Sequence, residues 1–202
     1  MVVHIVMVPP VAVAPAHRAV DAVGEELARS LERLAAALST PQSRPQIEEL
    51  LLTARLLRPM VVAAEEAITT ARDSLSLNPR ARRYRRELDE IDHLLSIFQP
   101  VVTQTIGMTR AVYDHYDTSL AAEPSIAAIA DQLERAAHDI RLDMRRAPRS
   151  TAGEPTVSTT TLPALTAPLT VTQPSRTNWI VVGSLLEDLR RIHAQLRDER
   201  TA

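Results

Sequence analysis

The densest group of side chains able to bind a ligand is a run of arginines near the middle of the chain. Five guanidinium groups fall within seven residues, at Arg80, Arg82, Arg83, Arg85 and Arg86. Such a run can bind anionic lipid headgroups, where each juxtamembrane arginine gains about 1 kcal/mol. The alternative is the solvated start of a helix. Nucleic acid is a weaker expectation, because the chain has 23 basic against 25 acidic residues.

Histidines and carboxylates give only weak signals of metal or acid–base chemistry. Asp89 with His93, and Glu134 with His138, lie four residues apart, a spacing that can chelate a metal but more often forms an ion pair. The cluster YDHYD at residues 113–117 is more typical of a polar helix end. Cysteine is absent, which excludes thiolate nucleophiles and cysteine zinc sites. We therefore expect no catalytic residues, no metal site and no cofactor.

A small-molecule pocket at two helix kinks is a further candidate. Pro59 and Pro100 fall inside long helical patterns, where each removes a backbone hydrogen bond at a cost of roughly 3 kcal/mol. In a hairpin folded about residues 78–79, Pro59 would lie opposite Phe98 and the two prolines at nearly the same height. Gln104 and Met108 could then complete a pocket with Phe98. The alternatives are local repacking at a kink, or a new and shorter helix starting at each proline.

The elements that must position these residues are amphipathic helices. Five aromatic and four glycine residues are too few for a β-sandwich or a glycine-rich phosphate loop. Apolar residues spaced three and four apart predict five helices, at about residues 15–39, 45–77, 79–120, 124–146 and 178–200. The cleanest pattern covers four heptads of the second helix. We expect an elongated all-α bundle of four to five helices, with the second and third forming a long antiparallel hairpin.

Composition divides the chain into four parts. Residues 1–14 are apolar but interrupted by prolines, and are either an extended segment or a juxtamembrane segment too short to span a bilayer. Residues 15–146 are predicted to form a four-helix bundle. Residues 147–177 are rich in Thr, Ser and Pro and predict an extended linker or surface loop. Residues 178–202 predict a last amphipathic helix that packs on the bundle.

Two regions carry a family resemblance. Between residues 74 and 114, a Leu-Asn-Pro turn precedes the arginine run and a long helix with a downstream Thr-Arg pair. The matching residues are Leu77, Asn78, Pro79, Arg80, Arg82, Arg83, Arg85, Arg86, Thr109 and Arg110. A pattern W-x-x-x-G-x-L-x-x-D-L-x-R follows near the end, through Trp179, Gly183, Leu185, Asp188, Leu189 and Arg191. These features resemble the cytoplasmic region of actinobacterial proteins of the fusaric acid resistance (FUSC-like), or aromatic acid exporter-like, group.

The resemblance implies a structural or regulatory domain on the cytoplasmic face of the plasma membrane. Export of aromatic or other weak organic acids would belong to membrane spans that this sequence lacks. Its expected partners are its own membrane domain, an anionic lipid surface and a second subunit bound through the heptad face of the hairpin. The alternative is a free-standing helical adaptor that dimerises through the hairpin. A ligand-sensing bundle is a third hypothesis.

Overall fold

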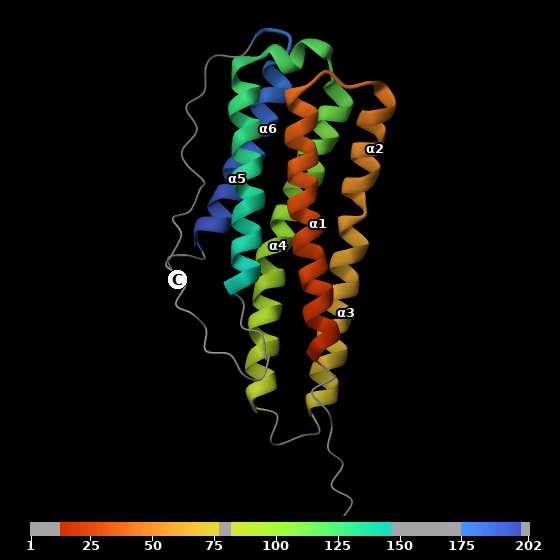
Figure 1. Ribbon diagram of the computed structural model, residues 1–202, viewed down its shortest axis with the longest axis vertical. Helices are drawn as coiled ribbons and strands as arrows, with labels where there is room; N and C mark the ends of the chain where they lie inside the picture. The colour runs from red at the N-terminus through yellow and green to blue at the C-terminus, as the bar shows by residue number, and fades with distance from the viewer. Residues whose placement is uncertain (1–12, 77–81, 147–174, 199–202) are drawn as a thin grey trace, which may run out of the picture.

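The chain is an elongated all-α bundle, as the sequence predicts (Figure 1). The computed structural model describes residues 13–76, 82–146 and 175–198. Within these ranges the elements are α1 (Val13–Ser39), α2 (Arg44–Arg55), α3 (Leu57–Ser76), α4 (Arg82–His115), the 3-10 helix η2 (Thr118–Ala122), α5 (Pro124–Arg146) and α6 (Trp179–Asp198). The predicted turn at residues 78–79, Arg80, residues 1–12 of the predicted N-terminal segment and residues 147–174 of the predicted linker lie outside the described residues.

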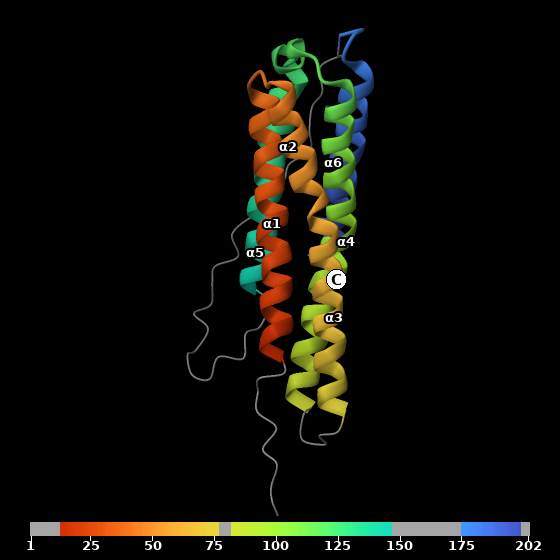
Figure 2. The same ribbon diagram turned by 90° about the vertical axis from the view of Figure 1, so that its right-hand side faces the viewer.

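Helix α1 occupies the centre of the bundle. It contacts α2, α3, α4 and α5, whereas α6 packs on α4 and α5. In Figures 1 and 2, α3 and α4 lie side by side along the lower half of the molecule, and α6 follows the upper half of α4. The start of α1, the end of α3 and the start of α4 therefore meet at one end, with η2 and the start of α6 at the other.

The predicted second helix is bent and consists of two segments, α2 and α3. Pro59 has no N–H to donate to the carbonyl of Arg55, and the backbone tightens just before it. The N–H of Leu56 donates to the carbonyl of Thr53 at 3.1 Å, and that of Met60 to Leu56 at 3.4 Å. A new helix thus starts near Pro59, whereas α4 continues through Pro100 without interruption.

Four side-chain contacts join α3 to α4 along the hairpin. Gln99 donates a hydrogen bond to Glu65, and Arg72 donates one to Asp92 at 2.9 Å. Arg72 also lies 3.7 Å from Asp89, and Arg85 donates to the carbonyl of Leu75. Together these contacts place Pro100 opposite residues 60–64, which is one to five residues beyond Pro59.

The interface of α1 with α4 and α5 requires a glycine. A Cβ added at Gly24 would lie 2.8 Å from Cε2 of Phe98 and would also overlap the side chain of Met144. Phe98, from α4, is fully buried, and Met144 is the α5 residue that meets it here. The missing side chain lets both residues lie directly on the α1 backbone.

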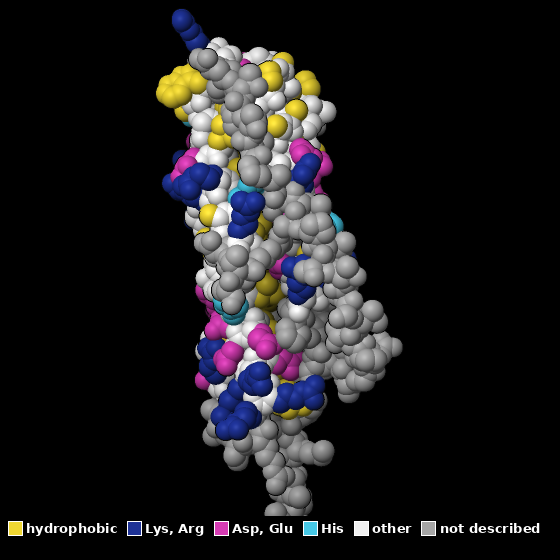
Figure 3. Space-filling model, turned by 90° about the vertical axis from the view of Figure 1, so that its left-hand side faces the viewer, with side chains coloured by type: hydrophobic (Ala, Val, Ile, Leu, Met, Phe, Trp, Pro, Cys, Tyr) yellow, Lys and Arg dark blue, Asp and Glu magenta, His cyan; other side chains and the backbone are white. Residues whose placement is uncertain are grey.

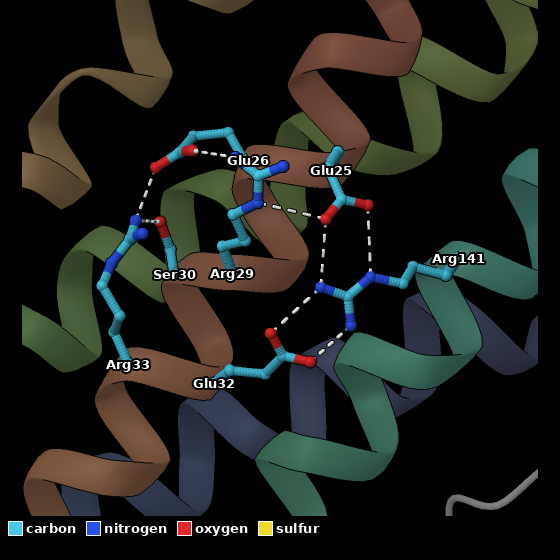
Figure 4. Close-up of polar contacts among 7 residues, drawn as sticks. All are labelled: Glu25, Glu26, Arg29, Ser30, Glu32, Arg33 and Arg141. Atoms are coloured by element: carbon cyan, nitrogen blue, oxygen red, sulfur yellow. Dashed lines mark hydrogen bonds and ion pairs between the residues drawn. The ribbon is translucent and has the colours of Figure 1, made fainter.

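A group of ion pairs joins α1 to α5 at the edge of the core (Figure 4). Arg141 of α5 donates from Nε to Glu25 at 3.2 Å and from Nη2 to Glu32 at 3.0 Å. Its hydrogen bonds lower the pKa of both carboxyl groups. Because these carboxylates are partly exposed, water screens the attraction, and its contribution to stability is modest.

A polar cluster holds the start of α6 against the start of α5. Asn178 precedes α6, and its Nδ2 donates to Glu123 at 2.9 Å and to Ser119 at 3.2 Å. The N–H of Ser175 donates to the same Glu123 carboxylate at 3.3 Å. Hydrogen bonding by the Ser175 side chain, and then by Asn178, lowers the pKa of Glu123. The side chain of Asn178 therefore fixes a tertiary contact.

We expect Gly24→Ala to lower the free energy of unfolding by about 1–2 kcal/mol, because overpacking outweighs the gain in helix propensity. The matched control is Gly183→Ala in α6, where an added Cβ would meet no atom within 4 Å. That control should raise stability by about 0.5–1 kcal/mol. Urea denaturation at low protein concentration measures both. Equal stabilisation by the two substitutions would show that the α1 interface has room for a methyl group.

We expect Arg141→Gln to lower the free energy of unfolding by about 1 kcal/mol at neutral pH. In the folded state the pKa values of Glu25 and Glu32 lie below the ordinary value of 4.5. Their contribution is therefore present above pH 4.5 and disappears as the pH falls through the folded pKa values. The stability difference between wild type and variant should shrink between pH 6 and pH 3. A constant difference in denaturation experiments would contradict this account.

Candidate anion-binding site

The start of α4 carries three arginines with no partner in the described part of the chain. Arg82, Arg83 and Arg86 are exposed, and no ion pair or hydrogen bond engages them. Arg85 differs from them, because its Nη2 donates to the backbone carbonyl of Leu75 at 3.2 Å, near the end of α3. The four described arginines of the predicted run thus comprise three with no partner among the described residues and one that joins α3 to α4.

The charge at this helix start is unfavourable for the helix itself. The N-terminus of a helix carries a partial positive charge, and each cation placed there costs roughly 0.3–1 kcal/mol. The first turn of α4 contains no acidic residue that would offset it. Departures from such local rules are expected at functional sites. Arginines beside the free N–H groups of a first helical turn attract anions.

Nearby carboxylates are engaged elsewhere. Glu87 contacts His17 of α1, with 2.8 Å between the His17 Nε2 and a carboxylate oxygen. Asp89 lies 3.7 Å from the guanidinium of Arg72. Neither therefore neutralises the arginines at the start of α4, although Glu90 is exposed nearby.

Helix α1 begins at the same end and adds a further cation. The contact between His17 and Glu87 holds the first turns of α1 beside those of α4. Arg18 follows His17, is exposed, and has no partner among the described residues. Figure 3 shows dark-blue Arg side chains near the lower end of the molecule, with magenta Asp and Glu side chains beside and above them. The sequence pattern does not indicate Arg18, because only tertiary packing places the start of α1 beside that of α4.

The five residues predicted to form a pocket do not come together. Phe98 and Met108 are fully buried in the core, whereas Pro59 is exposed on α3. Pro100 and Gln104 instead border an open groove of about 330 Å³ between α4 and α6. Periodicity identified the face of α4 on which these residues lie but could not show that other helices cover Phe98 and Met108.

Ion pairs within α6 occupy one wall of this groove. Arg190 and Arg191 both border it and both bind Glu187, at 2.9 and 3.0 Å. Hydrogen bonds from Arg190, and then from Arg191, lower the pKa of Glu187 to about 2. An anionic ligand would have to compete with this carboxylate, so the groove is a weaker anion site than the start of α4.

The other candidate clusters have structural contacts. Tyr116 accepts a hydrogen bond from the N–H of Gln42, and Arg44 stacks 4.0 Å from the ring centroid of Tyr113. Asp114 pairs with Arg110, and Asp117 accepts from the N–H of Ser119 at 2.8 Å. In the described ranges, no three His or acidic side chains are grouped so as to hold a metal ion.

Exposed apolar side chains occur at two places that apolar periodicity did not indicate as surface. Leu52, Leu56 and Val62 lie on the outer side of α2 and α3, and Trp179 and Ile180 begin α6. Leu52 and Leu56 of the first group belong, with Pro59, to a second apolar stripe along the helix. These three residues are spaced four and three apart, so the stripe can be predicted from the sequence.

No helix in the described ranges combines the length and apolar character needed to cross a bilayer. Comparison of the chain with protein-family models, curated proteins and solved structures finds no match.

We expect Arg85→Gln to lower the free energy of unfolding by about 1 kcal/mol, because it removes a charged hydrogen bond to the end of α3. Arg82→Gln, Arg83→Gln and Arg86→Gln should each leave stability unchanged or raise it slightly, since they remove a cation from a helix N-terminus. Thermal and urea denaturation test all four. Equal destabilisation by the four substitutions would contradict the distinct role given to Arg85.

Proposed function

We propose that this chain is a non-catalytic helical domain that binds an anionic membrane surface through the start of α4. The observation that carries the proposal is the set of three exposed, unpaired arginines, Arg82, Arg83 and Arg86, beside the start of α1. Lipid phosphates can be bound by such guanidinium groups without a shaped pocket, because the attraction comes mainly from charge. Arg18 on the neighbouring helix extends the same basic surface.

In this proposal the chain corresponds to the cytoplasmic domain of a FUSC-like, aromatic acid exporter-like membrane protein. Its role is structural or regulatory, and export of weak organic acids belongs to membrane-spanning parts outside this sequence. The support is the sequence resemblance together with the position of the arginines at the end where α1 begins. A chain that enters α1 from a membrane would hold Arg82, Arg83 and Arg86 near the lipid surface.

The alternative is a free-standing adaptor that associates through the α2–α4 hairpin. The heptad face of this hairpin cannot serve, because Ile47, Leu57 and Ile68 are buried in the chain's own core. Its outer face exposes Leu52 and Leu56, which are 62% and 58% accessible.

The charges that meet on this outer face depend on the register of the contact. When antiparallel copies pair with Leu52 against Leu56, Arg55 lies near Arg55 of the second copy. Pairing Leu52 against Leu52 instead brings Arg55 near Glu49 of the second copy, so that opposite charges meet.

The test is co-sedimentation of the chain with vesicles that contain phosphatidylserine and with vesicles of phosphatidylcholine alone. We expect binding to the anionic vesicles only, and weaker binding as salt rises. A triple variant in which Arg82, Arg83 and Arg86 are all replaced by Gln should have a partition coefficient about 100-fold lower. The reason is that each arginine contributes about 1 kcal/mol of binding free energy at an anionic surface.

The matched control removes three other exposed, unpaired arginines, Arg55, Arg58 and Arg176, and changes the net charge equally. It should bind the vesicles nearly as well as wild type. Equal loss in both triple variants would show that net charge alone, and no particular site, attracts the lipid. Absence of binding at low salt would reject the lipid proposal and favour the adaptor.

A further inference from the structure

The face of α6 that packs on α4 and α5 is apolar apart from a histidine near its end. His193 directly follows Ile192, one of the fully buried residues of this face. Its ring is half-buried, and its Nε2 atom is buried without a hydrogen-bond partner among the described residues. A buried polar atom without a partner weakens the contact in which it lies. The docking of α6 therefore contains a titratable group that its surroundings do not satisfy.

Few charged groups act on the His193 ring. From α5, the carboxylate of the fully buried Asp139 faces it, and from α6 itself the guanidinium of Arg197 lies one turn further along. Helix α4 contributes none, because residues 94–109, which include the segment beside α6, contain no titratable side chain. One negative and one positive group thus act on the ring in opposite directions.

The charged side chains one turn away on the same side of α5 have partners of their own. Arg135 pairs with Asp131 at 2.9 Å, and Asp143 with Arg146 at 3.5 Å. Neither pair leaves a single uncompensated charge beside His193. Burial therefore decides which form of the imidazole is favoured.

This environment favours the neutral imidazole. Removal from water, and then repulsion by Arg197, lower the pKa of His193 below the ordinary value of 6.5, although Asp139 opposes the change. If α6 leaves α4 and α5, the ring returns to water and recovers its ordinary pKa. A proton is therefore bound more readily when α6 is undocked than when it is docked.

We propose that α6 is a detachable helix whose docking weakens in mild acid, because a proton on His193 places a positive charge within the contact. The contribution of the neutral ring is complete above pH 6.5 and declines as the pH falls below it. Helix α1 contacts α2, α3, α4 and α5, so these helices can stay packed when α6 leaves. Its departure exposes the apolar surface of α4 and α5 that it covers.

The two other titratable groups that this helix contact involves can be distinguished from His193. Glu123, which binds Asn178, has a pKa below 4.5, so this contact is lost only in stronger acid. Asp188 is partly buried in α6, and burial raises its pKa above 3.8. Protonation of Asp188 strengthens docking, which is the opposite of the effect of His193.

Hydrogen exchange of the full chain at pH 7.5, 6.5 and 5.5, without lipid and corrected for intrinsic exchange rates, tests the proposal. Peptides from α6 should lose protection several-fold as the pH falls, whereas peptides from α1 keep theirs. Binding of a fluorescent dye for apolar surfaces should rise over the same range. Constant protection of α6, or an equal loss in every helix, would overturn the proposal.

His193→Gln should make the protection of α6 independent of pH in this range, because the replacement takes up no proton. The matched control is His115→Gln, which removes an exposed histidine from the end of α4. It should keep the response of the wild type. A wild-type response in His193→Gln would reject the role of His193.

A direct titration does not depend on how well the variants fold. In the NMR spectrum of the wild-type chain, the His193 ring signals should titrate with a midpoint below pH 6.5. A midpoint at or above 6.5 would overturn the proposal. None of these measurements involves vesicles, so this inference and the lipid proposal can fail separately.

Discussion

The close approach of α1 to α4 and α5 at Gly24 is the constraint on which the packing of the bundle depends. The chain has a single Phe, and its core is built mainly from Leu, Val, Ile and Ala, which fill space only when helices lie close together. Phe98 and Met144 lie directly on the α1 backbone because residue 24 has no side chain. Arg141, less than one turn before Met144, binds Glu25, the neighbour of Gly24. Packing and charge thus specify the same register of α5 along α1.

The order of the helices gives the molecule two chemically different ends. The start of α1, the end of α3 and the start of α4 meet at the basic end, because α3 and α4 form an antiparallel hairpin (Figure 1). The start of α6 lies at the other end, where Asn178 binds Glu123 at the start of α5. The proposed lipid contact uses the basic end.

Local charge and tertiary packing conflict at the start of α4, and packing prevails. Arginines in a first turn oppose the helix dipole, but α4 buries a long apolar face against α1, α2, α3 and α6. Arg85 reduces the conflict by donating to a carbonyl near the end of α3, where the helix dipole favours a cation. Within the described part of the chain, Arg82, Arg83 and Arg86 have no such compensation. That difference makes them the candidates for an external anion.

The sequence by itself determined the all-α class, the helical hairpin and most helix boundaries, because apolar periodicity and proline position act locally. The predicted helix 124–146 matches α5 residue for residue, since Pro124 begins it. Only the tertiary structure decided the hairpin register, because sliding helices with the same repeat preserves their apolar faces. The tertiary structure also gives Arg85 a hydrogen-bond partner on α3 that Arg82, Arg83 and Arg86 lack among the described residues. It places Phe98 and Met108 in the core. Side-chain period shows which face a residue occupies, but what covers that face depends on segments distant in sequence.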